Sequence, residues 1–138
     1  MRLNLLALVV ALAARAWAES DEEEEREPEP QPTIFNSVTV PPPFELTPTN
    51  WEHEVKKTKW LIVKHYSPYC PHCIDFLPVY QTAYEFYHTS KSPDGKPFAD
   101  EYDFRFAVIN CVAHSEFCED HNVKSWPTTV IYKDGERR

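Results

Sequence analysis

Two cysteines separated by two residues stand between an apolar stretch and an amphipathic one. Cys70-Pro71-His72-Cys73 follows Trp60 to Val63, a nearly continuous apolar run of the kind found in strands buried on both faces. After Cys73, apolar residues recur at three- and four-residue spacings up to Tyr87, which predicts a helix with one buried face. Pro71 suits the first turn of that helix. The sequence therefore predicts a cysteine pair at a strand-to-helix junction.

This position favours redox chemistry. Residues three apart in the first turn of a helix face the same side, so the sulfurs of Cys70 and Cys73 can close a small disulfide ring. The helix N-terminus favours an anion, and a protonated His72 adds positive charge, so we expect Cys70 to be the reactive thiolate. A stabilised thiolate also stabilises the reduced dithiol, which makes the disulfide form a stronger oxidant.

The remaining pattern predicts an α/β domain. Strands and helices alternate, an arrangement that allows a sheet with both parallel and antiparallel strands. A hydroxyl or amide within Thr47 to Asn50 is expected to cap the first helix. We predict further strands at Phe44 to Leu46, Phe104 to Ile109 and Thr128 to Tyr132, helices at Trp51 to Lys57 and Ser115 to His121, and a loop at Lys91 to Asp100.

The first 43 residues differ from the rest in composition. Residues 1–18 join Arg2, an apolar run and Ala16-Trp17-Ala18, which predicts a cleaved secretory signal peptide; the run is shorter than the ~20 residues that a membrane anchor needs. Residues 19–43 form an acidic, proline-rich leader. Its Glu19 to Pro32 portion is predicted to be a solvated, extended spacer, with weak Ca²⁺ binding as an alternative. The domain then covers residues 44–138.

Charge and composition exclude several functions. The 14 basic residues against 22 acidic ones give a formal net charge of −8, which argues against a nucleic-acid binder that depends on phosphate contacts. Only 2 glycines stand against 13 prolines, so a glycine-rich phosphate loop is not available. We expect no metal and no organic cofactor, and membrane contact only through a segment outside this sequence.

Three motifs resemble one known family. Tyr66 to Cys73 reads aromatic-small-Pro-aromatic-CxxC, with Pro-His between the cysteines where Gly-His is more usual. Trp126-Pro127-Thr128 is similar to a cis-proline loop, and Pro78 stands five residues after Cys73, where a helix-kinking proline is typical. Together they resemble the thioredoxin-fold, a-type domains of the protein disulfide isomerase family. With the signal peptide, the Pro-His pair is most similar to fungal, membrane-held isomerases of the endoplasmic reticulum.

The resemblance implies a thioredoxin fold and a thiol-disulfide oxidoreductase in the lumen of the endoplasmic reticulum. Its partners would be unfolded or partly folded secretory polypeptides and a thiol-oxidising or glutathione redox partner. Cys70 would attack and Cys73 would resolve the mixed disulfide. The resemblance also assigns active-site support to Pro71, His72 and a cis Pro127, a substrate groove to Tyr69, Trp126 and Thr128, and a structural disulfide to Cys111 and Cys118.

Two features depart from the family pattern. A buried acid that shuttles the proton of the second sulfur usually stands six residues before the attacking cysteine, whereas this chain has Lys64. Lys64 either extends to water or acts as a neutral base, and its presence favours simple oxidation over isomerisation. Because the sequence stops at Arg138, we also expect the domain to lack its last strand and last helix and to belong to a longer protein.

Other functions remain open. The domain could bind peptides or act as a chaperone without catalysis, which the departures from the family would permit. A zinc module could use the four cysteines, although the spacing between Cys111 and Cys118 does not fit one. That second pair could also be redox-regulatory rather than structural.

Overall fold

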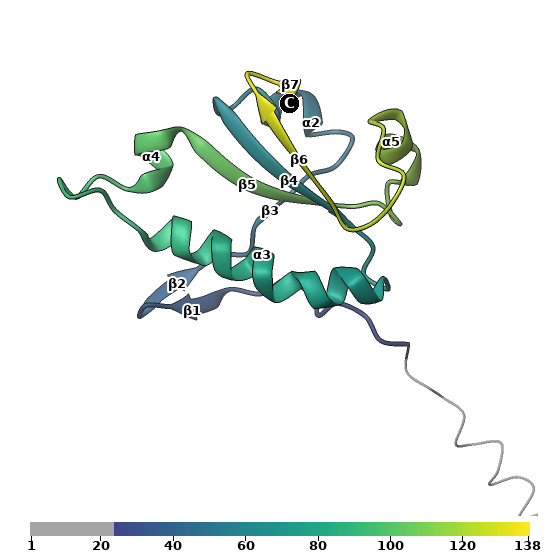
Figure 1. Cartoon of the computed structure of the whole chain (residues 1–138), viewed down its shortest axis with the longest axis horizontal. Helices are drawn as coiled ribbons and strands as arrows, with labels where there is room; N and C mark the ends of the chain where they lie inside the picture. Colours follow the sequence, from purple (N-terminus) through teal and green to yellow (C-terminus); the bar gives the residue numbers. More distant parts are fainter. Residues whose placement is uncertain (1–23) are drawn as a thin grey trace, which may run out of the picture.

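The structure, a computed structural model, describes residues 24–138. The predicted signal peptide and the first residues of the leader lie outside the described residues. A five-stranded sheet forms the centre, with the long helix α3 on one face and α2 and α5 on the other (Figure 1). The strands are β3 (Phe44–Glu45), β4 (Trp60–Tyr66), β5 (Phe104–Asn110), β6 (Thr128–Lys133) and β7 (Glu136–Arg137), and the helices α2 (Trp51–Glu54), α3 (Pro71–Thr89), α4 (Phe98–Tyr102) and α5 (Ser115–Asp120).

The sheet is mixed and has the order β3-β5-β4-β6-β7. β3, β5 and β4 run parallel, whereas β6 pairs antiparallel with β4 and β7 antiparallel with β6. This is the predicted α/β thioredoxin architecture. The expectation that the last strand is missing is wrong, because Asp134 and Gly135 take positive φ angles of 51° and 83° and reverse the chain into β7.

Alternating side chains of β4 point to opposite faces of the sheet. Leu61 and Val63 are fully buried on the face covered by α2 and α5, in a core that includes Trp51. Tyr80 of α3 lies on the other face, where its hydroxyl donates to the carbonyl oxygens of Ile62 at 3.2 Å and Ala107 at 2.8 Å. The helix that begins at the cysteine pair is therefore fixed to the two central strands.

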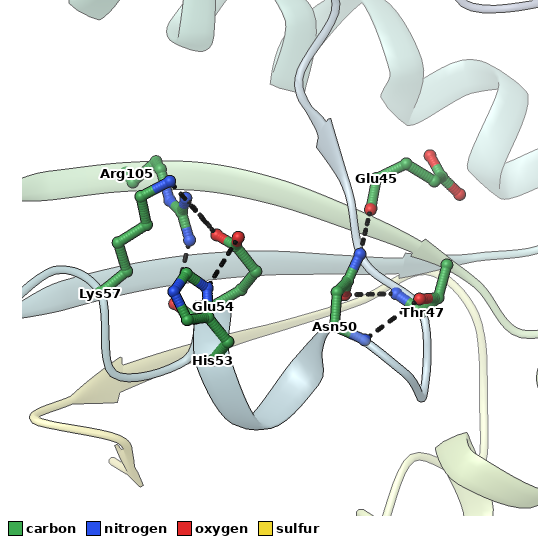
Figure 2. A network of polar contacts seen from close by, with 7 residues as sticks. All are labelled: Glu45, Thr47, Asn50, His53, Glu54, Lys57 and Arg105. Atoms are coloured by element: carbon green, nitrogen blue, oxygen red, sulfur yellow. Dashed lines mark hydrogen bonds and ion pairs between the residues drawn. The ribbon is translucent and has the colours of Figure 1, made fainter.

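The connection from β3 to α2 is held by side-chain hydrogen bonds (Figure 2). Asn50 is the N-cap residue, and its side chain makes no capping bond; of the hydroxyl and amide groups predicted to cap this helix, the Thr47 hydroxyl accepts the Asn50 backbone N–H at 3.4 Å. The Asn50 amide instead accepts from the backbone N–H of Thr47 at 2.8 Å and donates to the carbonyl oxygen of Glu45 at 3.2 Å. Asn50 thus closes the turn between strand and helix.

Arg105 of β5 ties α2 to the sheet (Figure 2). Its guanidinium donates to the carboxylate of Glu54 and, at 2.9 Å, to the Glu54 carbonyl oxygen. Burial alone would raise the pKa of Glu54, but hydrogen bonds from Arg105 and His53 outweigh it and lower that pKa. Lys57 adds a weaker, exposed contact at 3.9 Å.

Within the predicted spacer Glu19 to Pro32, the described residues 24–32 have no regular secondary structure and are exposed, except for the buried Glu27, whereas the rest of the leader folds. Strands β1 (Thr33–Phe35) and β2 (Val38–Val40) form an antiparallel hairpin beside α3 (Figure 1). The Thr33 hydroxyl donates to the Glu85 carboxylate at 2.8 Å, and the Tyr84 hydroxyl donates to the Pro41 carbonyl oxygen at 2.9 Å. The part of the leader from Thr33 to Pro41 is therefore packed onto the domain.

The predicted loop at Lys91 to Asp100 is interrupted at its end by α4. Phe98, the first residue of this helix, packs its ring against that of Tyr87, whose hydroxyl donates to the Phe98 carbonyl oxygen at 2.9 Å. This aromatic contact with α3 fixes α4, and no local sequence pattern predicts it.

Replacing Arg105 by alanine is expected to lower the free energy of unfolding by about 2–4 kcal/mol, because it removes the main cation and two hydrogen bonds from the buried Glu54. Urea unfolding followed by circular dichroism measures the change. Lys57→Ala is the matched control and should cost less than about 1 kcal/mol. Equal losses in the two variants would contradict the role given to Arg105.

Candidate active site

The cysteine pair lies where β4 ends and α3 begins. Cys70 is the N-cap residue of α3, and its backbone N–H donates to the Ser67 carbonyl oxygen at 3.3 Å. Pro71 occupies the first helical turn, where a backbone donor is not needed. The Cys73 backbone N–H donates to the Cys70 sulfur at 3.3 Å. The helix terminus thus directs a hydrogen-bond donor at the Cys70 sulfur.

The two cysteines differ in access to solvent. Cys70 is partly exposed, whereas Cys73 is fully buried. Burial, together with the hydrogen bond to Cys70, raises the pKa of the Cys73 thiol to about 12. One sulfur can therefore meet a partner from solution, and the other can react only inside the protein.

The loop before β6 faces Cys70. Antiparallel pairing places His65 of β4 opposite Thr128 of β6, so the residues before Thr128 lie beside the end of β4. The Trp126–Pro127 peptide bond is cis. The Cys70 sulfur lies 3.5 Å from the Trp126 carbonyl oxygen, to which its thiol donates. The sheet register therefore brings the two motifs together.

The other residues assigned from the resemblance surround this point. His72 is exposed in the first turn of α3. Tyr69 and Trp126 keep 42% and 40% of their surface exposed, so both rings are open to a partner. The Thr128 hydroxyl donates to the Ser125 carbonyl oxygen at 2.6 Å and so holds the loop. A substrate groove along these residues stays a prediction.

Cys111 and Cys118 are joined by a disulfide in the structure. Both are buried, and the Cys111 backbone N–H donates to the Tyr66 carbonyl oxygen at 2.8 Å. The bond therefore fixes α5 to the end of β4, close to the start of the redox-site turn. This placement suits a structural role.

Extension of Lys64 to water, one of the two alternatives that the sequence left open, is wrong. Lys64 is almost fully buried on β4, and its ammonium lies 3.2 Å from the Glu27 carboxylate and 4.8 Å from the centre of the Tyr66 ring. Sequence reasoning missed Glu27, because an acid among prolines and other acids is typical of a solvated segment. The one sequence feature that could have indicated Glu27 was its negative charge, because Lys64 is a cation within an apolar strand.

Comparison with known proteins identifies the family of the chain. The thioredoxin family model matches residues 42–138, so the chain belongs to the thioredoxin family. The ER-retained PMA1-suppressing protein 1 of Saccharomyces cerevisiae is 34% identical over 91 residues, or 65% of this chain and 12% of that protein. Protein disulfide-isomerase of Oryctolagus cuniculus is 29% identical over 91 residues, or 66% of this chain and 16% of that protein.

Solved structures of thioredoxin-fold proteins are also similar to this chain. The first two thioredoxin domains of Saccharomyces cerevisiae Eps1p match with a TM-score of 0.59 and 28% identity, over 72% of this chain and 33% of that one. A Halobacterium salinarum thioredoxin, 20% identical with a TM-score of 0.52, matches 70% of this chain and 73% of that one, and so shows the fold. The chain spans 12–17% of the length of the first curated relatives. Within residues 24–138, no helix has the length and apolar character needed to cross a membrane.

In the reduced protein at pH 7, iodoacetamide is expected to modify Cys70 at least about a hundredfold faster than Cys73, because Cys73 is buried and protonated. Mass spectrometry of peptides after timed quenching measures both rates. Similar rates at the two sulfurs would contradict the asymmetry described above.

His65 should make stability depend on pH. It is fully buried, and burial lowers its pKa from 6.5 to about 4. As the pH falls, His65 of the unfolded chain therefore binds a proton at a higher pH than His65 of the folded chain. Up to about 3 kcal/mol of stability, which is fully present above pH 6.5, is lost as the pH falls to 4. Urea unfolding between pH 4 and 7 should show a smaller pH dependence for His65→Gln. The exposed-site control His88→Gln should keep the wild-type dependence.

Proposed function

We propose that this protein is a thiol-disulfide oxidoreductase that acts through Cys70 and Cys73. One observation carries the proposal: a partly exposed sulfur at a helix N-terminus receives a backbone hydrogen bond from its buried partner cysteine and faces a cis-proline loop. Membership of the thioredoxin family and similarity to a protein disulfide-isomerase support the same chemistry.

The exchange proceeds in two steps. The Cys70 thiolate attacks a substrate disulfide, forms a mixed disulfide, and one substrate sulfur leaves with the electron pair. Cys73 then attacks the Cys70 sulfur, which closes the Cys70–Cys73 disulfide and releases the second substrate sulfur. In the opposite direction, the oxidised pair transfers its disulfide to two substrate thiols. A glutathione pool or a thiol oxidant restores the starting state.

The proposed substrates are unfolded or partly folded secretory polypeptides in the lumen of the endoplasmic reticulum. The exposed rings of Tyr69 and Trp126 beside the cis-proline loop suit an extended peptide that adds to the backbone there. The name of the yeast relative, an ER-retained protein, supports the compartment. Transfer of disulfides to clients is proposed as the main direction.

Cysteine substitutions separate this function from a non-catalytic peptide-binding or chaperone role. In oxidative refolding of reduced ribonuclease A in glutathione buffer, Cys70→Ser should reduce the rate to the uncatalysed level. Cys73→Ser should accumulate a covalent mixed disulfide, because the resolving sulfur is absent. Glu52→Gln, at an exposed position of α2, should match the wild type. Equal assistance by Cys70→Ser and wild type would favour the binding module.

A further inference from the structure

A carboxylate from the leader lies inside the domain beside the redox site. Glu27 precedes the segment that matches the family model, which begins at residue 42. Its backbone N–H donates to the Pro68 carbonyl oxygen at 2.7 Å, within the turn that leads to Cys70. Its Oε1 accepts a hydrogen bond from the Lys64 ammonium at 3.2 Å, and the two side chains are 5% and 3% exposed. Both a backbone and a side-chain contact fix Glu27.

The second oxygen of this carboxylate is unused. Glu27 Oε2 is buried and has no hydrogen-bond partner among residues 24–138. Glu27 lines a cavity of about 470 Å³ together with Lys64, Pro68 and Leu77, and Leu77 lies one helical turn after Cys73. An unpartnered acceptor in a cavity this close to the dithiol helix can take up a proton, directly or through water.

The surroundings keep this carboxylate basic. Burial raises the pKa of Glu27, and the Lys64 ammonium opposes that rise. The titratable and charged groups that line the same cavity are Lys64 and Tyr66 on β4, Tyr80 on α3, and Arg26 and Glu29 of its own segment; Glu27 also interacts electrostatically with Cys73 on α3 and Glu45 on β3. Since Lys64 is the cation paired with Glu27, a proton on Glu27 leaves the buried Lys64 ammonium without its counter-charge, which favours return of that proton.

Cys73 needs such an acceptor. Its thiol must lose a proton before it can attack the mixed disulfide at Cys70, yet the residue is fully buried. The negative charge of Glu27 is among the causes that hold the Cys73 thiol protonated, so the two groups are electrostatically coupled. Moving the proton from one to the other conserves the charge of the pocket.

We propose that Glu27 accepts the proton of Cys73 when Cys73 resolves the mixed disulfide, and that Lys64 positions Glu27 for this transfer. The inference rests on the proposed oxidoreductase function. The Cys73 S–H bond gives its proton to the Glu27 carboxylate. The resulting thiolate forms the Cys70–Cys73 bond, and the substrate–Cys70 disulfide bond breaks. The substrate sulfur leaves with the electron pair, and Glu27 later returns its proton to solvent.

The reaction of the reduced protein with the aromatic disulfide 5,5′-dithiobis(2-nitrobenzoate) separates the two steps. Attack by Cys70 releases the first coloured thiolate, and attack by Cys73 releases the second. Glu27→Gln should slow the second phase at least about tenfold near pH 7 and change the first by less than about twofold. The deficit should shrink as the pH rises, because hydroxide then removes the proton. Glu25→Gln, an exposed acid of the same segment, should leave both phases unchanged.

A double variant distinguishes proton transfer from a purely structural ion pair. Glu27→Gln with Lys64→Met contains no unpaired buried charge, and circular dichroism checks its fold. A second phase that stays slow in this variant supports the inference. Return of the wild-type second phase, or an unchanged second phase in Glu27→Gln, would overturn it. If the wild-type protein shows no second phase at all, the proposed function fails instead.

Discussion

Antiparallel pairing between β4 and β6 is the constraint on which the site depends. β4 ends at Tyr66, and the cysteine pair follows it, while Pro127 immediately precedes β6. Because His65 is opposite Thr128, the register brings the cis-proline loop to Cys70. His65 also contacts the Thr128 carbonyl oxygen at 3.2 Å, so a buried side chain supports the same junction. A slip of one residue would turn the alternating faces of β4 over and separate the loop from the sulfur.

The sequence predicts the elements whose periodicity is strong. The apolar run at Trp60 to Val63 and the helical spacing after Cys73 correspond to β4 and α3. It does not predict the β1–β2 hairpin, because Asn36 and Ser37 reverse the chain with positive φ angles inside a proline-rich segment. Elements made by long-range contacts, such as α4 against Tyr87, leave no local signal.

The candidate site divides in the same way. The two cysteines and the proline between them are placed by local sequence, since CxxC at a strand-to-helix junction has few geometries. The partner of Lys64 could not be predicted, because 37 residues separate it from Glu27 and neither has a pattern that indicates burial. A lysine in a central strand requires a buried anion, and the leader supplies it. Glu27 and the β1–β2 hairpin are thus part of the domain in structure, although the family match begins only at residue 42.

The central claim is that Cys70 and Cys73 form a reversible couple suited to giving disulfides to clients. Its most direct test is the reduction potential of that couple, measured in glutathione buffers on protein whose Cys111–Cys118 disulfide is intact. We expect a value above the endoplasmic-reticulum poise of about −180 to −210 mV, toward the −120 mV or so of strong oxidants. A value near −270 mV, or no reversible couple, would contradict the claim.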